Sequence, residues 1–163
     1  MKATKKIGKI KAAKDTQQNS DFCVVARTEA FIVGQGLSEA LKRADAYRRA
    51  GADGVLIHSK SKTPDQVLAF MQEWGNACPV VIVPTTYYMT ETRLFEKAGI
   101  SMVIWANHLL RASIHAMQQT AKKIFMEKSL AVIETEIATV AEVFRLQNVE
   151  ELNAAEKRYL PPA

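Results

Sequence analysis

Short apolar runs recur along the first two thirds of the chain, and polar or charged residues end each of them. The runs predict strands at 22–26, 54–58, 80–83 and 102–106. An unbroken apolar run of this length is typical of a strand that a parallel sheet buries on both faces. Segments with helical periodicity fill the intervals, so the pattern predicts an α/β fold of four strand–helix units joined by right-handed crossovers.

The three intervals between the strands each predict an amphipathic helix. Ser38, Thr90 and a capping box from Thr63 to Gln66 are the expected helix starts. Gly51 and Gly99 follow two of the helices as terminators. The residues expected to face the core are Leu37, Ala40, Leu41, Ala44, Tyr47, Val67, Phe70, Met71, Trp74, Leu94, Phe95 and Ala98.

The pattern divides the chain into three parts. Residues 1–20 form a basic N-terminal segment with a short helix at 7–13, and residues 21–128 hold the four strand–helix units, the last with a long helix at 110–125. Residues 129–163 supply a C-terminal helix and a tail at 159–163. The apolar positions of that helix are Ile133, Ile137, Val140 and Phe144.

Composition narrows the function classes. The 163 residues are 48% apolar and 24% charged, which suits one globular domain, and no apolar run approaches the roughly 20 residues of a membrane span. The net charge of +5 includes six basic residues within the first 14 positions, which we interpret as a solvated end and not a nucleic-acid site. No secretory signal is evident. The two cysteines, Cys23 and Cys78, are expected as buried, reduced thiols of a cytoplasmic protein.

Candidate chemistry lies where the strands end. Ligands of parallel α/β folds bind at the carboxyl ends of the strands, so these groups are expected to share one rim. Arg27 suits bidentate contact with a carboxylate or phosphate, although it could instead form a structural ion pair with Glu29. His58 could hydrogen-bond substrate or hold a neighbouring charge. The full set of rim groups is Arg27, Glu29, His58, Ser59, Thr85, Thr86, Asn107 and His108.

His108 has a second interpretation as a helix-start residue, and Tyr87 and Tyr88 are interpreted as packing residues. No metal-ligand cluster, nucleophile elbow or phosphate loop is visible in the sequence. The residues alone therefore assign no catalytic group and no metal ligand.

Several segments, in order along the chain, resemble the phosphoenolpyruvate phosphomutases of the isocitrate lyase superfamily. They are 21–31, 39–44, 50–53, 58–60, 79–85, 103–108, 110–114, 142–147 and 159–161. The resemblance implies part of a (β/α)8 TIM barrel, with strands corresponding to the fifth to eighth, and a last helix swapped between subunits of an oligomer. It implies an Mg²⁺-dependent isomerase of phosphonate biosynthesis that interconverts phosphoenolpyruvate and phosphonopyruvate. Arg27 and His58 match the family's substrate-binding residues.

The resemblance also implies that much of the family's site is missing. Its magnesium-binding aspartates belong to the first four strands, for which this chain has no counterpart. We therefore expect a truncated gene product, a mis-called start or one piece of a split enzyme, inactive alone. Open edges and inner side chains without partners, such as Val81, Val83 and Ile104, predict a homo-oligomer or pairing with a complementary N-terminal half-barrel. The alternatives are a phosphonopyruvate hydrolase, a carbon–carbon lyase of the same superfamily, or a non-catalytic remnant.

Overall fold

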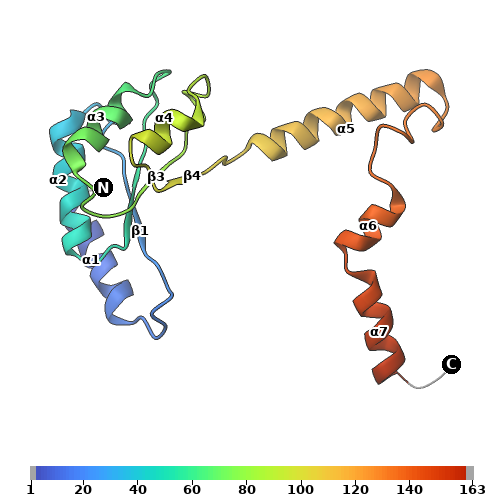
Figure 1. Cartoon of the computed structure of the whole chain (residues 1–163), viewed down its shortest axis with the longest axis horizontal. Helices are drawn as coiled ribbons and strands as arrows, with labels where there is room; N and C mark the ends of the chain where they lie inside the picture. Colours follow the sequence, from blue (N-terminus) through green and yellow to red (C-terminus); the bar gives the residue numbers. More distant parts are fainter. Residues whose placement is uncertain (1–2, 161–163) are drawn as a thin grey trace. The chain divides into compact units, whose positions relative to one another are not determined.

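A computed structural model describes residues 3–160 (Figure 1), so residues 1–2 of the basic segment and residues 161–163 of the predicted tail lie outside it. The chain divides into two compact units, residues 1–108 and 109–163. The first unit contains the sheet and four helices, and the second contains most of the helical C-terminal part.

The first unit is built on a parallel sheet with the strand order β1-β2-β3-β4. The strands lie where the apolar runs predict them, although β1 begins three residues later than expected and β4 is short. Because each strand pairs with the next one along the chain, four parallel strands of a barrel-like α/β fold are confirmed. The strands are β1 (Val25–Thr28), β2 (Gly54–Ile57), β3 (Val80–Ile82) and β4 (Met102–Val103).

Helices pack on one face of this sheet. The residues predicted for the stripes of α2 and α3 are buried, notably Tyr47, Phe70 and Trp74, and the rings of Phe70 and Trp74 stack with centroids 5.3 Å apart. Phe70 and Trp74 pack in one cluster with Val55 and Ile57 of the sheet, whereas Tyr47 packs in a second cluster with Ala26. The helices of this unit are α1 (Ala3–Asp15), α2 (Gly36–Arg49), α3 (Asp65–Trp74) and α4 (Thr92–Lys97).

The other face of the sheet, which we call the inner face, is exposed at the two edge strands, β1 and β4. Along β1 buried and exposed residues alternate, and Val25 is 48% exposed, so the prediction that this strand is buried on both faces is wrong. The reason is that the helices cover only the opposite face. Val81 was expected to be uncovered but is buried, because β3 has a neighbouring strand on either side.

The predicted helix starts are wrong in detail. The N-cap residues are Gln35, Pro64 and Glu91, and none of them forms a side-chain cap. The Thr63 hydroxyl donates to the Asp65 carboxylate at 2.7 Å and not to the helix backbone. The terminators are confirmed, since Gly51 and Gly99 have φ angles of 100° and 80°, in the left-handed region that favours glycine.

The thiols differ from expectation. Cys23 precedes β1 and is exposed, and Cys78 is half-buried. The apolar run that was predicted as a strand at 22–26 begins outside the sheet, so its first residues are not covered by neighbouring strands. The prediction of two buried thiols is therefore wrong.

The helices of the C-terminal part are α5 (His108–Glu127), whose first residue belongs to the first unit, α6 (Val140–Leu146) and α7 (Val149–Tyr159). Residues 131–137 form turns, so the helix predicted from Ile133 begins only at Val140, where the Thr139 hydroxyl accepts the Glu142 N–H at 3.1 Å. The helix α7 was not predicted. None of the helices described in residues 3–160 is long and apolar enough to cross a membrane.

Candidate functional site

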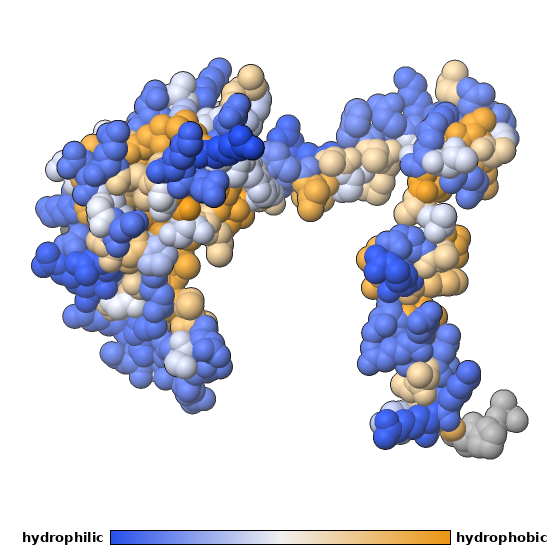
Figure 2. Space-filling view, viewed as in Figure 1, coloured by the Kyte–Doolittle hydropathy of each residue, from blue (hydrophilic) through white to orange (hydrophobic). Residues whose placement is uncertain are grey.

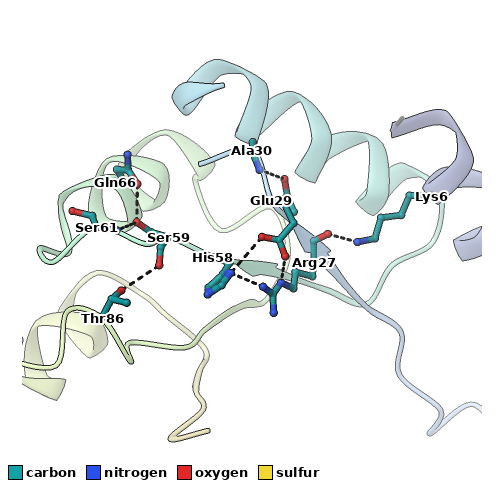
Figure 3. A network of polar contacts seen from close by, with 10 residues as sticks. Lys6, Arg27, Glu29, Ala30, His58, Ser59, Ser61, Gln66 and Thr86 are labelled. Carbon is teal, nitrogen blue, oxygen red and sulfur yellow. Dashed lines mark hydrogen bonds and ion pairs between the residues drawn. The ribbon is translucent and has the colours of Figure 1, made fainter. Parts of the chain in front are cut away.

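A polar trio joins the carboxyl ends of β1 and β2 (Figure 3). Arg27 Nη2 lies 2.5 Å from Nδ1 of His58, and the Arg27 Nε–H donates to the Glu29 carboxylate. The second carboxylate oxygen of Glu29 lies 3.3 Å from the same His58 nitrogen. The strand register sets this geometry: because Arg27 is paired with Leu56, both strands end at one rim. The predicted ion pair of Arg27 with Glu29 is present as well.

The trio constrains the protonation of His58. A guanidinium has no acceptor atom, so in the contact with Arg27 the Nδ1 of His58 is the acceptor and the ring proton lies on Nε2. In that state Nδ1 cannot also donate to Glu29. A doubly protonated His58 would donate to Glu29 instead and would repel Arg27. The arrangement with Arg27 bound therefore leaves the Nε2–H as a hydrogen-bond donor.

The carboxylate of Glu29 is held in its charged form. Partial burial acts to raise the pKa of Glu29, but the hydrogen bond and positive charge of Arg27, together with the neighbouring His58, outweigh it and leave the pKa below its ordinary value. Glu29 therefore remains ionised and keeps the guanidinium of Arg27 directed along the rim.

A cavity of about 450 Å³ lies beside the trio. Its charged groups are three cations and one carboxylate, so it favours anions. Lys6 of α1 reaches it and donates to the backbone carbonyl of Arg27, and burial lowers the pKa of Lys6. His58 is not part of the lining. The lining residues are Lys6, Arg27, Glu29, Val33, Gln35, Arg43 and Tyr47.

Hydrogen bonds fix the loop that follows His58. Ser59 is 1% exposed, its hydroxyl donates to the side-chain oxygen of Gln66 at 2.7 Å, and it accepts the Ser61 N–H at 3.0 Å. The Thr86 hydroxyl donates to the Ser59 carbonyl at 3.3 Å, which ties the loop after β3 to the loop after β2 (Figure 3). Of the predicted rim groups, Ser59 and Thr86 therefore support the loop backbone.

The remaining predicted groups lie apart from the trio. His108 is the first residue of α5, as its helix-start interpretation requires, and its ring meets Trp105 edge to face with centroids 5.9 Å apart. Tyr87 is fully buried against Phe95, and burial raises the pKa of Tyr87 to about 12, whereas Tyr88 is 70% exposed. Sequence reasoning missed Lys6, because nothing distinguishes it from the other lysines of the basic segment.

The described residues do not fit a magnesium ion. Within 3–160 no three side chains of His, Cys, Asp or Glu gather in the way that a metal site requires. Glu29 is the only carboxylate of the trio, and it already forms an ion pair with Arg27. No metal-dependent step is therefore assigned to the side chains of residues 3–160.

The parallel sheet, with charged groups at the carboxyl ends of its strands, has the fold of about half of the (β/α)8 barrel seen in structures of the phosphoenolpyruvate mutase/isocitrate lyase superfamily. The phosphoenolpyruvate phosphomutase family model matches residues 1–125. The chain belongs to this family.

Individual relatives give the extent of the likeness. The chain is 58% identical to a phosphoenolpyruvate phosphomutase of Tetrahymena pyriformis over 94% of its own length and 51% of the relative's. The phosphoenolpyruvate phosphomutase structure from Streptomyces platensis subsp. rosaceus is 46% identical, with a TM-score of 0.92 over 98% of this chain and 56% of that one. The structure of a phosphonopyruvate hydrolase with oxalate and Mg²⁺ is 38% identical, with a TM-score of 0.90 over 99% and 57%. The chain thus spans about half the length of its relatives.

Proposed function

We infer that the chain supplies the substrate-clamping half of a phosphoenolpyruvate phosphomutase-like site. The observation that carries this proposal is the contact of Arg27 with His58 at the carboxyl ends of adjacent strands. The guanidinium of Arg27 offers parallel N–H donors to a carboxylate or phosphonate. His58, with its proton on Nε2, offers one more donor to an anion at the rim.

The proposed reaction moves a phosphoryl group within one molecule. In the direction of phosphonopyruvate, the phosphorus–oxygen bond of phosphoenolpyruvate breaks, the enolate becomes a ketone, and the phosphorus joins the methylene carbon. The substrate carries both a carboxylate and a phosphoryl group throughout, so a fixed guanidinium would neutralise part of that charge and hold the enolate in place. Arg27 and His58 would bind and orient the substrate.

A second candidate is hydrolysis of phosphonopyruvate to pyruvate and phosphate. The structure of a phosphonopyruvate hydrolase resembles this chain nearly as closely as that of the phosphomutase. Both reactions act on the same anion, so the trio suits either of them. The fate of the phosphoryl group depends on whether water reaches it.

Magnesium and an association partner are further parts of the proposal. Because the described carboxylates do not gather, a magnesium ion would have to be held by groups outside the described residues. We expect those groups on a complementary half-barrel that pairs with the free edges of this sheet. The chain can also associate with copies of itself.

Phosphorus NMR separates these possibilities. The chain is incubated with phosphonopyruvate and Mg²⁺, alone and after co-expression with the N-terminal half of the Tetrahymena pyriformis relative. We expect no conversion by the chain alone and a phosphoenolpyruvate signal from the pair. A phosphate signal from the pair would instead support the hydrolase. Failure of the correctly folded pair to convert phosphonopyruvate, or rapid turnover by the chain alone, would contradict the proposal of a half-site.

A further inference from the structure

The loop that follows β2 determines where His58 stands. The strand ends at Ile57, so His58 is the first residue beyond it, and its position depends on how the loop continues. At the next residue, Ser59, both the hydroxyl and the backbone carbonyl form hydrogen bonds (Figure 3). The partners of these two groups belong to two other elements of the fold, so parts of the molecule outside β1 and β2 influence the trio.

Two hydrogen bonds fix Ser59 from different directions. Its hydroxyl donates at 2.7 Å to the side-chain oxygen of Gln66, the second residue of α3. Its carbonyl accepts at 3.3 Å from the hydroxyl of Thr86, in the loop after β3. The side chain and the carbonyl leave the Cα atom in different directions, so the two bonds together restrict rotation of the residue. Because a planar peptide bond joins His58 to Ser59, the backbone of His58 is restricted as well.

The two partners of Ser59 are themselves held by the core. Gln66 belongs to α3, which packs on the sheet through the fully buried side chain of Phe70. Thr86 is followed directly by Tyr87, which is also fully buried, and whose ring meets Phe95 of α4 edge to face with centroids 6.0 Å apart. Close-packed side chains leave little room for movement. The positions of Gln66 and Thr86 are therefore set by the packing of α3 and α4.

Burial does not fix the trio itself. Hydrophilic residues cover much of the visible surface of the first unit (Figure 2), and the side chains of Arg27, Glu29 and His58 are 45%, 40% and 28% exposed. A shift of about 1 Å in the backbone of His58 would lengthen its 2.5 Å contact with Arg27 to the limit of a hydrogen bond. A binding site needs supporting hydrogen bonds that keep its side chains within roughly 0.5 Å of the productive geometry.

We propose that Gln66 and Thr86 are positioning residues for His58. Together they hold Ser59 so that Nδ1 of His58 accepts from Arg27 and the Nε2–H is presented to a bound anion. Neither side chain has to touch the substrate. The effect on the ring of His58 concerns the free chain, whereas the effect on substrate binding rests on the proposed function. Through Thr86, the loop after β3 contributes to a site whose charged groups come from β1 and β2.

Conservative substitutions separate the hydrogen bonds from the shape of the side chains. Thr86→Val removes the hydroxyl and keeps the branched shape, whereas Thr86→Ser keeps the hydroxyl. Gln66→Met removes the acceptor at similar length, whereas Gln66→Glu keeps an acceptor. Thr16→Val is the matched control, because the Thr16 hydroxyl also donates to a backbone carbonyl, that of Ala12 at 2.8 Å, at the end of α1 and outside the network around Ser59. Circular dichroism verifies that each variant is folded.

NMR of the free chain measures the position of the ring without any ligand. In the unaltered chain we expect a nuclear Overhauser contact between the Arg27 side chain and the Hε1 proton of His58, which neighbours Nδ1. Thr86→Val and Gln66→Met should each lose most of this contact. Thr86→Ser, Gln66→Glu and Thr16→Val should retain it. An undiminished contact in either Thr86→Val or Gln66→Met would overturn the proposal, whether or not the chain binds phosphonopyruvate.

Calorimetric titration with phosphonopyruvate tests whether Thr86 acts through His58. Thr86→Val should weaken binding by about three- to tenfold, which corresponds to one lost hydrogen bond, and Thr86→Ser should restore most of the affinity. In a His58→Ala background, Thr86→Val should change the affinity by less than about twofold, because the residue through which it acts is gone. Equal losses in the two backgrounds would overturn the proposal. Absence of binding by the unaltered chain would instead contradict the proposed function, and the NMR contact would still decide the positioning.

Discussion

Arg27 and His58 are 31 residues apart in the sequence, yet the Nη2 of one lies 2.5 Å from the Nδ1 of the other. The pairing of β1 with β2 produces this contact, because each residue stands at or just beyond the end of its strand. Glu29 completes the trio and neutralises one positive charge. The remaining donors of the pair are available to an anion.

The first prediction concerns the shape of the guanidinium. Arg27→Lys keeps the charge but removes the planar pair of donors, so binding of phosphonopyruvate should weaken by about tenfold or more. Isothermal titration calorimetry measures the affinity. Arg49→Ala is the control, because Arg49 is exposed on α2 and pairs only with Asp45, and it should bind normally. Equal affinity of Arg27→Lys and the unaltered chain would exclude a bidentate role.

The second prediction concerns the pH dependence of stability. The pKa of Glu29 lies below its ordinary value of 4.5 because its hydrogen bonds outweigh partial burial. The stabilisation is therefore fully present above pH 4.5 and is lost as the pH falls through the lower, folded-state value. Urea unfolding at several pH values should show a shallower loss of unfolding free energy below pH 4.5 for Glu29→Gln. Parallel pH curves for the two proteins would contradict the interpretation.

The third prediction concerns the buried hydroxyl of Ser59. Ser59→Ala removes the donor to Gln66 and the acceptor for the Ser61 N–H, so it should lower the unfolding free energy by about 1–3 kcal/mol. Ser113→Ala is the control. The Ser113 hydroxyl donates to the Leu110 carbonyl on an exposed helix surface, and its loss should cost about 0.5 kcal/mol or less. Similar losses in the two variants would argue against a network that fixes the loop after β2.

The fourth prediction concerns the core. Phe70 is fully buried and stacks on Trp74, so Phe70→Ala should lower the unfolding free energy by about 3–5 kcal/mol. Denaturant titration followed by tryptophan fluorescence measures it. Leu152→Ala provides the comparison, since Leu152 is 56% exposed, and it should change stability little. A loss below about 1 kcal/mol for Phe70→Ala would show that the packing of α3 on the sheet is wrongly assigned.

The sequence predicted which residues pack between the helices and the sheet better than it predicted where each helix begins. The stripes of α2 and α3 follow from the helical period alone, and residues such as Ala44 and Val67 are buried as expected. Helix starts depend on competing hydrogen bonds, which periodicity does not reveal. Gln66, for example, bonds Ser59 instead of capping α3. The exposure of Val25 depends on which face of the sheet the helices leave open.

The sequence likewise predicted only part of the candidate site. Arg27 and His58 could be placed on one rim because both follow apolar runs, and parallel strands end together. Lys6 could not, because its approach to the Arg27 carbonyl depends on how α1 packs against α2 and the sheet. The tautomer of His58 likewise requires the geometry of Arg27 and Glu29 around one ring nitrogen.

The most direct test of the proposed site is the NMR signal of the His58 imidazole during titration with phosphonopyruvate. The chain has three histidines, so His108 and His115 serve as internal references in the same spectrum. We predict a saturable shift of the His58 ring signals, with His108 and His115 unchanged, and loss of that shift in Arg27→Ala. Histidine signals that all remain unchanged, or a His58 shift that persists in Arg27→Ala, would contradict a shared Arg27–His58 binding site.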